Sequence, residues 1–252
     1  MHSKIAVLAL AVSVASSTYA QTPGAAMDRV YNLTNTQTPQ QMNEIATVVR
    51  SVGDIRQVYA VVPQKVLTVH GTIGQIAVAD WLVGALNRAA PESGTHEYHV
   101  PGSADDVVRV FYLNHARTPQ ETQKIVTAIR SLTEIQRIFI YNSLSAVAAR
   151  GTAAQIAFAE WLVNELNQPA QTRQPGTHEH TMTGYTNQVA RVFYLSNVDS
   201  TYELQQVVTA VRTTTEMQRI FINNARKAIA ARGTAEQIAS AERLISQLDR
   251  AR

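Results

Sequence analysis

The 252-residue sequence contains no cysteine, which excludes disulfides, thiolate chemistry and a lipid-accepting cysteine. Charged residues are few, at 16% of the chain, and the formal net charge of +3 is spread over interspersed basic and acidic positions. That balance argues against nucleic acid as a partner. No apolar run approaches the roughly 20 residues that a membrane-spanning helix needs. The composition therefore favours a protein without an integral membrane segment.

The first 20 residues have the pattern of a secretory signal peptide. Lys4 is followed by an apolar or small run over residues 5 to 14, and Thr18-Tyr19-Ala20 precedes Gln21. We therefore expect cleavage after Ala20 and an exported protein, periplasmic or associated with the cell envelope.

The rest of the chain repeats one stretch of sequence three times. The segment RVFYL at residues 109–113 returns at residues 191–195 and, loosened to RVYNL, at residues 29–33. A period this long is typical of a tandem array of small domains.

The repeat divides the chain into three modules and two linkers. We expect the modules at residues 27–88, 109–168 and 191–252. The linkers, residues 89–108 and 169–190, are rich in proline, glycine and threonine, and each should carry a short extended segment.

Each module reads as strand, helix, strand, strand, helix. In the second copy, Thr118 and Glu121 form a capping box around Pro119 and start the first helix. Two β-rich runs follow, and Gly151 and the Thr152 box then open a second helix. The sequence therefore predicts an α+β fold of three tandem βαββα modules, each a three-stranded sheet with two helices on one face.

The third copy resembles the periplasmic N-terminal domains of secretins, the ring channels of bacterial secretion and pilus systems. The likeness lies in Asn224, in IAARG at residues 229–233, in TAEQI at residues 234–238 and in LISQLD at residues 244–249. It extends over all three copies, but not to the β-rich channel domain of secretins. The resemblance implies protein contacts through sheet edges and helices, a secretion-associated role and no catalytic function.

The second helix of modules 1 and 2 carries apolar residues opposite its core-facing stripe. These residues form a candidate protein interface: Val78, Trp81, Phe158 and Trp161. The last copy has Ser240 and Arg243 at the two equivalent places, as expected if the outer helix face packs on a following module and the last module is a cap. The alternative is that each tryptophan folds back along its own helix.

No group of residues suggests catalysis, and we expect no catalytic, cofactor-binding or metal-binding residues and no cofactor. The segments His96-Glu97-Tyr98-His99 and His178-Glu179-His180 lack the spacing of a helical zinc motif, so solvated linker histidines are expected.

Two further sets of residues align between the copies. We expect the helix-surface carboxylates to be solvated or ion-paired, and the arginines at the end of each first helix to make structural contacts. The carboxylates are Asp80, Glu160 and Glu242, and the arginines are Arg50, Arg130 and Arg212.

These patterns favour a non-enzymatic, exported cell-envelope protein that acts as a scaffold or assembly module through protein partners or self-association. One alternative is a monomeric array that binds peptides or glycans in the periplasm. A more distant alternative is a hydrolase whose site forms between modules.

Overall fold

The computed structural model describes residues 25–91, 96–102, 105–116, 118–169, 176–198 and 200–250. The predicted signal peptide lies outside these ranges. Within them, no helix has both the length and the apolar character needed to cross a membrane.

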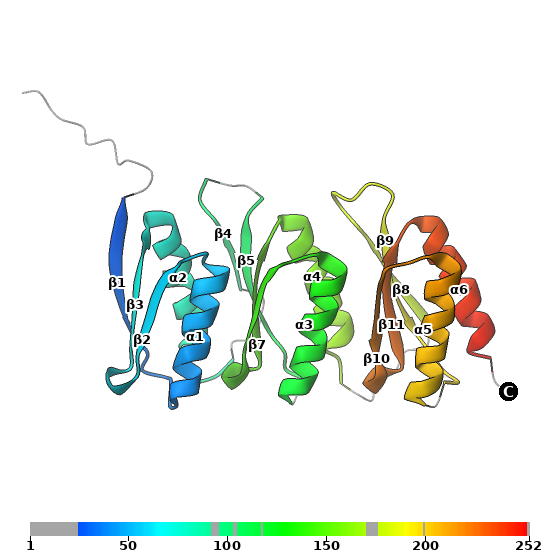
Figure 1. The fold of residues 1–252 in the computed structure, drawn as a ribbon, viewed down its shortest axis with the longest axis horizontal. Coiled ribbons are helices and arrows are strands. Elements are labelled where there is room, and N and C mark those ends of the chain that lie inside the picture. The colour runs from blue at the N-terminus through cyan, green and yellow to red at the C-terminus, as the bar shows by residue number, and fades with distance from the viewer. Residues whose placement is uncertain are drawn as a thin grey trace, which may run out of the picture.

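The predicted order of strand, helix, strand, strand, helix is confirmed in all three modules (Figure 1). Module 1 consists of β1 (Ala26–Asn32), α1 (Pro39–Val52), β2 (Gln57–Val61), β3 (Val66–Thr72) and α2 (Ile73–Leu86). Module 2 has the same elements in β5 (Val107–Tyr112), α3 (Pro119–Thr133), β6 (Arg137–Tyr141), β7 (Ala146–Gly151) and α4 (Ala153–Leu166). Module 3 has them in β9 (Val189–Tyr194), α5 (Thr201–Thr215), β10 (Arg219–Asn223), β11 (Ala228–Gly233) and α6 (Ala235–Leu248).

Local sequence signals set the ends of the helices. Thr118 accepts a hydrogen bond from the Glu121 amide while the Glu121 side chain binds the Thr118 amide, and all six helices begin with an equivalent reciprocal pair. Such a cap satisfies amides that have no partner within the helix and contributes about 1 kcal/mol.

The sheet of each module places the last strand in the middle. In module 1 the order is β1-β3-β2, and both outer strands are antiparallel to β3. The first helix therefore connects two parallel strands with a third inserted between them. A short 3₁₀ turn joins the second and third strands, for example η2 (Asn142–Leu144) in module 2.

Sheets 2 and 3 contain one strand more than predicted. The extended segments of the linkers form β4 (His96–His99) and β8 (Gly176–Thr181), which pair antiparallel with β5 and β9. The sheets are thus β4-β5-β7-β6 and β8-β9-β11-β10. The sequence predicts an extended segment in each linker, but strands of four to six residues in a glycine-rich linker carry little local signal for their pairing with the next strand.

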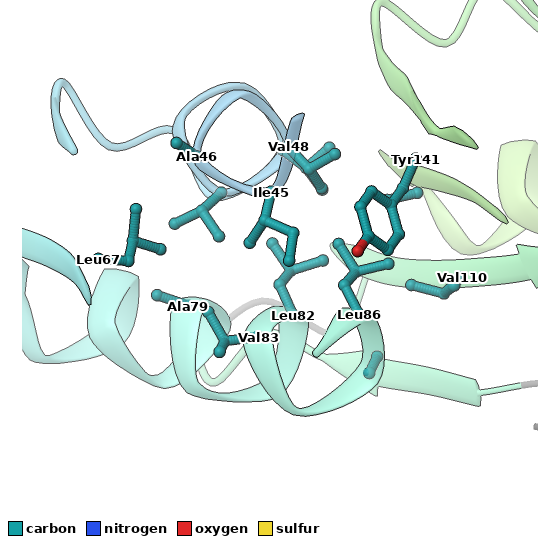
Figure 2. Packing of buried hydrophobic residues seen from close by; sticks show 14 of the residues in the cluster. Ile45, Ala46, Val48, Leu67, Ala79, Leu82, Val83, Leu86, Val110 and Tyr141 are labelled. Carbon is teal, nitrogen blue, oxygen red and sulfur yellow. The ribbon is translucent and has the colours of Figure 1, made fainter. Parts of the chain in front are cut away.

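The modules stack so that sheets and helix pairs alternate along the molecule (Figure 1). One buried cluster includes Ile45 and Leu86 from the helices of module 1 together with Val110 and Tyr141 from the sheet of module 2 (Figure 2). A second cluster joins the helices of module 2 to the sheet of module 3 in the same way. Each of these helix pairs is therefore buried between two sheets.

Candidate protein interface

The four predicted interface residues lie on α2 and α4, the second helices of modules 1 and 2. Val78 and Phe158 are each only 1% exposed. Trp81 and Trp161 are partly buried against the two clusters that span the module boundaries. Their role as an interface stays a prediction.

Both tryptophans contact the additional strand of the following sheet. The rings of Trp81 and Tyr98 have centroids 5.9 Å apart. At the next boundary Trp161 stacks on His180 at 5.1 Å, and Phe158 stacks on the same imidazole at 5.4 Å. Burial in this aromatic setting lowers the pKa of His180 below its ordinary value, because the charged imidazolium loses solvation.

The expectation of solvated linker histidines is wrong for this segment. His180 lies in β8 among aromatic rings, and His178 Nδ1 is 2.8 Å from Glu165 Oε2 on α4. In the described ranges, no three histidine, aspartate or glutamate side chains are grouped so that they could hold a metal ion.

In sheets 2 and 3, an arginine on the third strand of the module binds the end of the preceding module's first helix. Arg150 on β7 donates to the carbonyl oxygens of Val52 and Gly53 at 3.2 and 3.4 Å. Arg232 on β11 donates to the Leu132 carbonyl at 2.8 Å. Carbonyls at a helix end lack partners within the helix, so these guanidinium groups satisfy acceptors that the boundary would otherwise bury.

Two further pairs of equivalent residues cross the boundaries. Arg137 donates to Asp54 at 2.9 Å, and Arg219 forms the corresponding ion pair with Glu134. The Tyr112 hydroxyl donates to the Ala85 carbonyl in the last turn of α2 at 2.8 Å, and the Tyr194 hydroxyl lies 2.9 Å from the carboxylate and 3.1 Å from the carbonyl oxygen of Glu165 in the last turn of α4.

The sequence analysis did not identify these arginines and tyrosines, although the composition of β5 indicates that both faces of its sheet are covered. Apart from Arg109, the strand β5 is apolar at every position and buried throughout. An antiparallel strand that faces water on one side alternates apolar and polar residues, so an unbroken apolar run indicates cover on both faces.

The aligned carboxylates and arginines make the structural contacts that the sequence predicts. Asp80, Glu160 and Glu242 pair with arginines on the first strands of their own modules: Arg29, Arg109 and Arg191. The helix-end arginines donate to strand carbonyls: Arg50 to Val58, Arg130 to Ile138 and Arg212 to Ile220.

The outer face of sheet 1 corresponds to the faces that are buried in sheets 2 and 3. Its central row is Val30, Thr68 and Tyr59, three residues that lie side by side across the strands. The equivalent rows are Val110-Ala148-Phe139 and Val192-Ala230-Phe221, both packed against a helix pair.

Helices cover this face in modules 2 and 3, whereas no helix of the described residues covers it in module 1. Val30 and Tyr59 are 61% and 62% exposed, whereas Val110 and Val192 are fully buried. Adjacent apolar groups on an exposed sheet suit binding to another macromolecule.

No family model matches the sequence, and no curated protein matches it. Two solved structures are similar along most of its length. ExeD of Aeromonas hydrophila is 17% identical, with 89% of this chain and 41% of that chain covered and a TM-score of 0.22. A chain of the ETEC pilotin–secretin complex AspS–GspD is 16% identical, with 90% and 38% covered and a TM-score of 0.23.

This chain therefore spans about two fifths of the length of those two proteins. One of them belongs to a secretin complex, yet at such TM-scores the similarity assigns neither a domain family nor a function. The resemblance to secretin N-terminal domains stays a prediction from the sequence.

Proposed function

We propose that this protein is a non-enzymatic scaffold of the bacterial cell envelope, exported and associated with protein secretion, that binds another protein through the outer face of sheet 1. The observation that carries the proposal is the exposure of Val30 and Tyr59 on a face that helix pairs cover in the other two modules. The expected partner presents an amphipathic helical surface, because helices cover the equivalent faces.

The opposite end of the array has a different chemistry. On α6, Arg243 is exposed and donates to Ser240 at 3.1 Å, in the places that tryptophan and a buried apolar residue hold in α2 and α4. Head-to-tail stacking of copies would set this polar helix face against sheet 1, without the apolar contacts of the inner boundaries. A different protein is therefore the better occupant of sheet 1.

Site-specific photo-crosslinking in living bacteria tests the proposal. A photoreactive phenylalanine replaces Tyr59 in one strain and Tyr202, which is 68% exposed on α5, in a matched control strain. We expect a discrete crosslinked protein from position 59 that is absent from position 202 and lost when Val30→Glu is added. Equal patterns from both positions, or no product from position 59, would contradict the proposal.

A further inference from the structure

In the described part of the chain, sheet 1 has three strands and no counterpart of the additional strand in sheets 2 and 3. In those sheets β4 and β8 cover the outer edges of β5 and β9. The equivalent strand of module 1 is β1, and among the described residues only β3 pairs with it. Its other edge presents a row of backbone amides and carbonyls, the kind of edge to which an extended peptide can add.

The additional strands do more than pair their backbones, because each supplies a glutamate to an arginine. Glu97 on β4 lies directly opposite Arg109, and Arg109 Nη1 donates to it at 3.0 Å while Nη2 pairs with Glu160 on α4. In sheet 3, Glu179 lies opposite Arg191, which also pairs with Glu242 on α6. Each arginine is therefore held between one helix carboxylate and one strand carboxylate.

Arg29 is the corresponding arginine of β1, and its helix carboxylate is present. Its Nε and Nη2 donate to Asp80 at 2.9 and 3.0 Å. No strand among the described residues brings a second carboxylate to it. The Arg29 side chain is accordingly 48% exposed, compared with 7% for Arg109 and 18% for Arg191.

We propose that the free edge of β1 binds an extended segment of another protein, antiparallel and in the register of β4 on β5, with a glutamate opposite Arg29. The two described strands of this type, β4 and β8, are already paired, so the segment must come from elsewhere. The templates also define the residues beside the glutamate, which are histidine and tyrosine in one strand and two histidines in the other. The proposal concerns the edge of sheet 1 rather than its face, and it stands whether or not the face binds a helical partner.

A synthetic peptide with the sequence of residues 94–101, GTHEYHVP, is the probe. Its binding to the protein without residues 1–20 is followed by fluorescence anisotropy. Loss of a charge-assisted hydrogen bond of this kind weakens binding by about tenfold or more. We therefore expect that decrease for Arg29→Glu, with binding unchanged for Arg56→Glu, which makes the same charge change at another exposed arginine of module 1.

Reversing the charge of both Arg29 and the peptide glutamate tests whether the peptide binds at β1. The peptide GTHKYHVP should bind the Arg29→Glu variant more tightly than it binds the unmodified protein, and amide hydrogen exchange should slow along β1 when either matched pair forms. Absence of peptide binding, equal binding to the Arg29→Glu and unmodified proteins, or protection elsewhere in the sheets would overturn the inference. The crosslinking from position 59 reads the face independently, so failure of one proposal is distinguishable from failure of the other.

Discussion

The boundary between modules 1 and 2 and the boundary between modules 2 and 3 share some contacts and differ in others. The shared contacts are of two kinds: Arg150 and Arg232 bind backbone carbonyls at a helix end, and Arg137 and Arg219 form ion pairs with a side chain of the preceding module. Every residue type provides a carbonyl, so the contacts to backbone atoms persist while the side chains of the partner helix change.

Other contacts differ between the two boundaries. Glu44 binds Asn142 at the first boundary, and the place of Glu44 is taken by Lys124 at the second. Leu144, buried at the first boundary, corresponds to Arg226, whose Nε donates to the Leu166 carbonyl at 3.1 Å beside a small pocket. The comparison indicates that the arginine contacts recur at both boundaries, while the side chains that pack beside them differ.

The largest expected difference between the boundaries comes from one aromatic residue. Tyr141 is 2% exposed in the first boundary cluster, and its counterpart at the second is Asn223. We expect Tyr141→Ala to lower the free energy of unfolding by about 3 kcal/mol, because it leaves a cavity under α1. Asn223→Ala is the matched control and should cost about 1 kcal/mol. Equal losses in urea denaturation would show that the two boundaries are packed alike.

The shared arginines should behave alike at both boundaries. Arg150→Met and Arg232→Met each leave helix-end carbonyls without their donor, so each should cost about 2 kcal/mol. Faster amide exchange at the end of α1 or α3, respectively, would locate the loss. Arg243→Met, at an exposed position of α6, should change stability by less than about 0.5 kcal/mol. A loss at only one boundary would break the equivalence.

The tryptophans should contribute less, since both remain partly exposed. Trp161→Ala removes the stacking on His180, and Trp81→Ala removes the contact with Tyr98. We expect each change to cost about 1 to 2 kcal/mol and to loosen one boundary while every module stays folded. Small-angle scattering should then detect a more extended chain with unchanged helix content by circular dichroism. Unchanged dimensions would favour the alternative that the rings only cover their own helices.

The smallest effect should be a difference in acid sensitivity. His180 occupies the position of Tyr98, and burial lowers its pKa in the folded protein. The unfolded chain therefore binds more protons, and the stabilisation is complete above the unfolded pKa of about 6.5 and declines as the pH falls below it. We expect the second boundary to weaken as the pH falls below about 6.5, a contribution that the first boundary lacks because Tyr98 stands at this position. In His180→Tyr this decline should disappear from thermal melts, and its persistence would assign the effect to another group.

Local signals in the sequence predicted the modules well. Thr118, Pro119 and Glu121 define a helix start within four residues, and the repetition of such caps fixes the order of elements. The ion pairs of Asp80 and its counterparts could also be predicted from the sequence, because helix and strand belong to the same module.

Contacts between modules were harder to predict, for two physical reasons. A backbone acceptor such as the Val52 carbonyl leaves no trace in residue type, so the role of Arg150 was not visible. The register in which β4 pairs with β5, and β8 with β9, is defined only in the folded sheet. The pairing of β8 with β9 places His180 among aromatic rings.

Because sheets and helix pairs alternate, non-covalent contacts across each boundary hold neighbouring modules together in addition to the covalent linker. A protease that cuts between α4 and β8 would break the polypeptide but leave the boundary contacts of Arg219, Arg232 and Tyr194 in place. The nicked molecule should therefore migrate as two fragments under denaturing conditions and as one particle in native solution. The covalent connection would then serve to keep the modules at high local concentration during folding, while β8 stays paired with β9 after the cut.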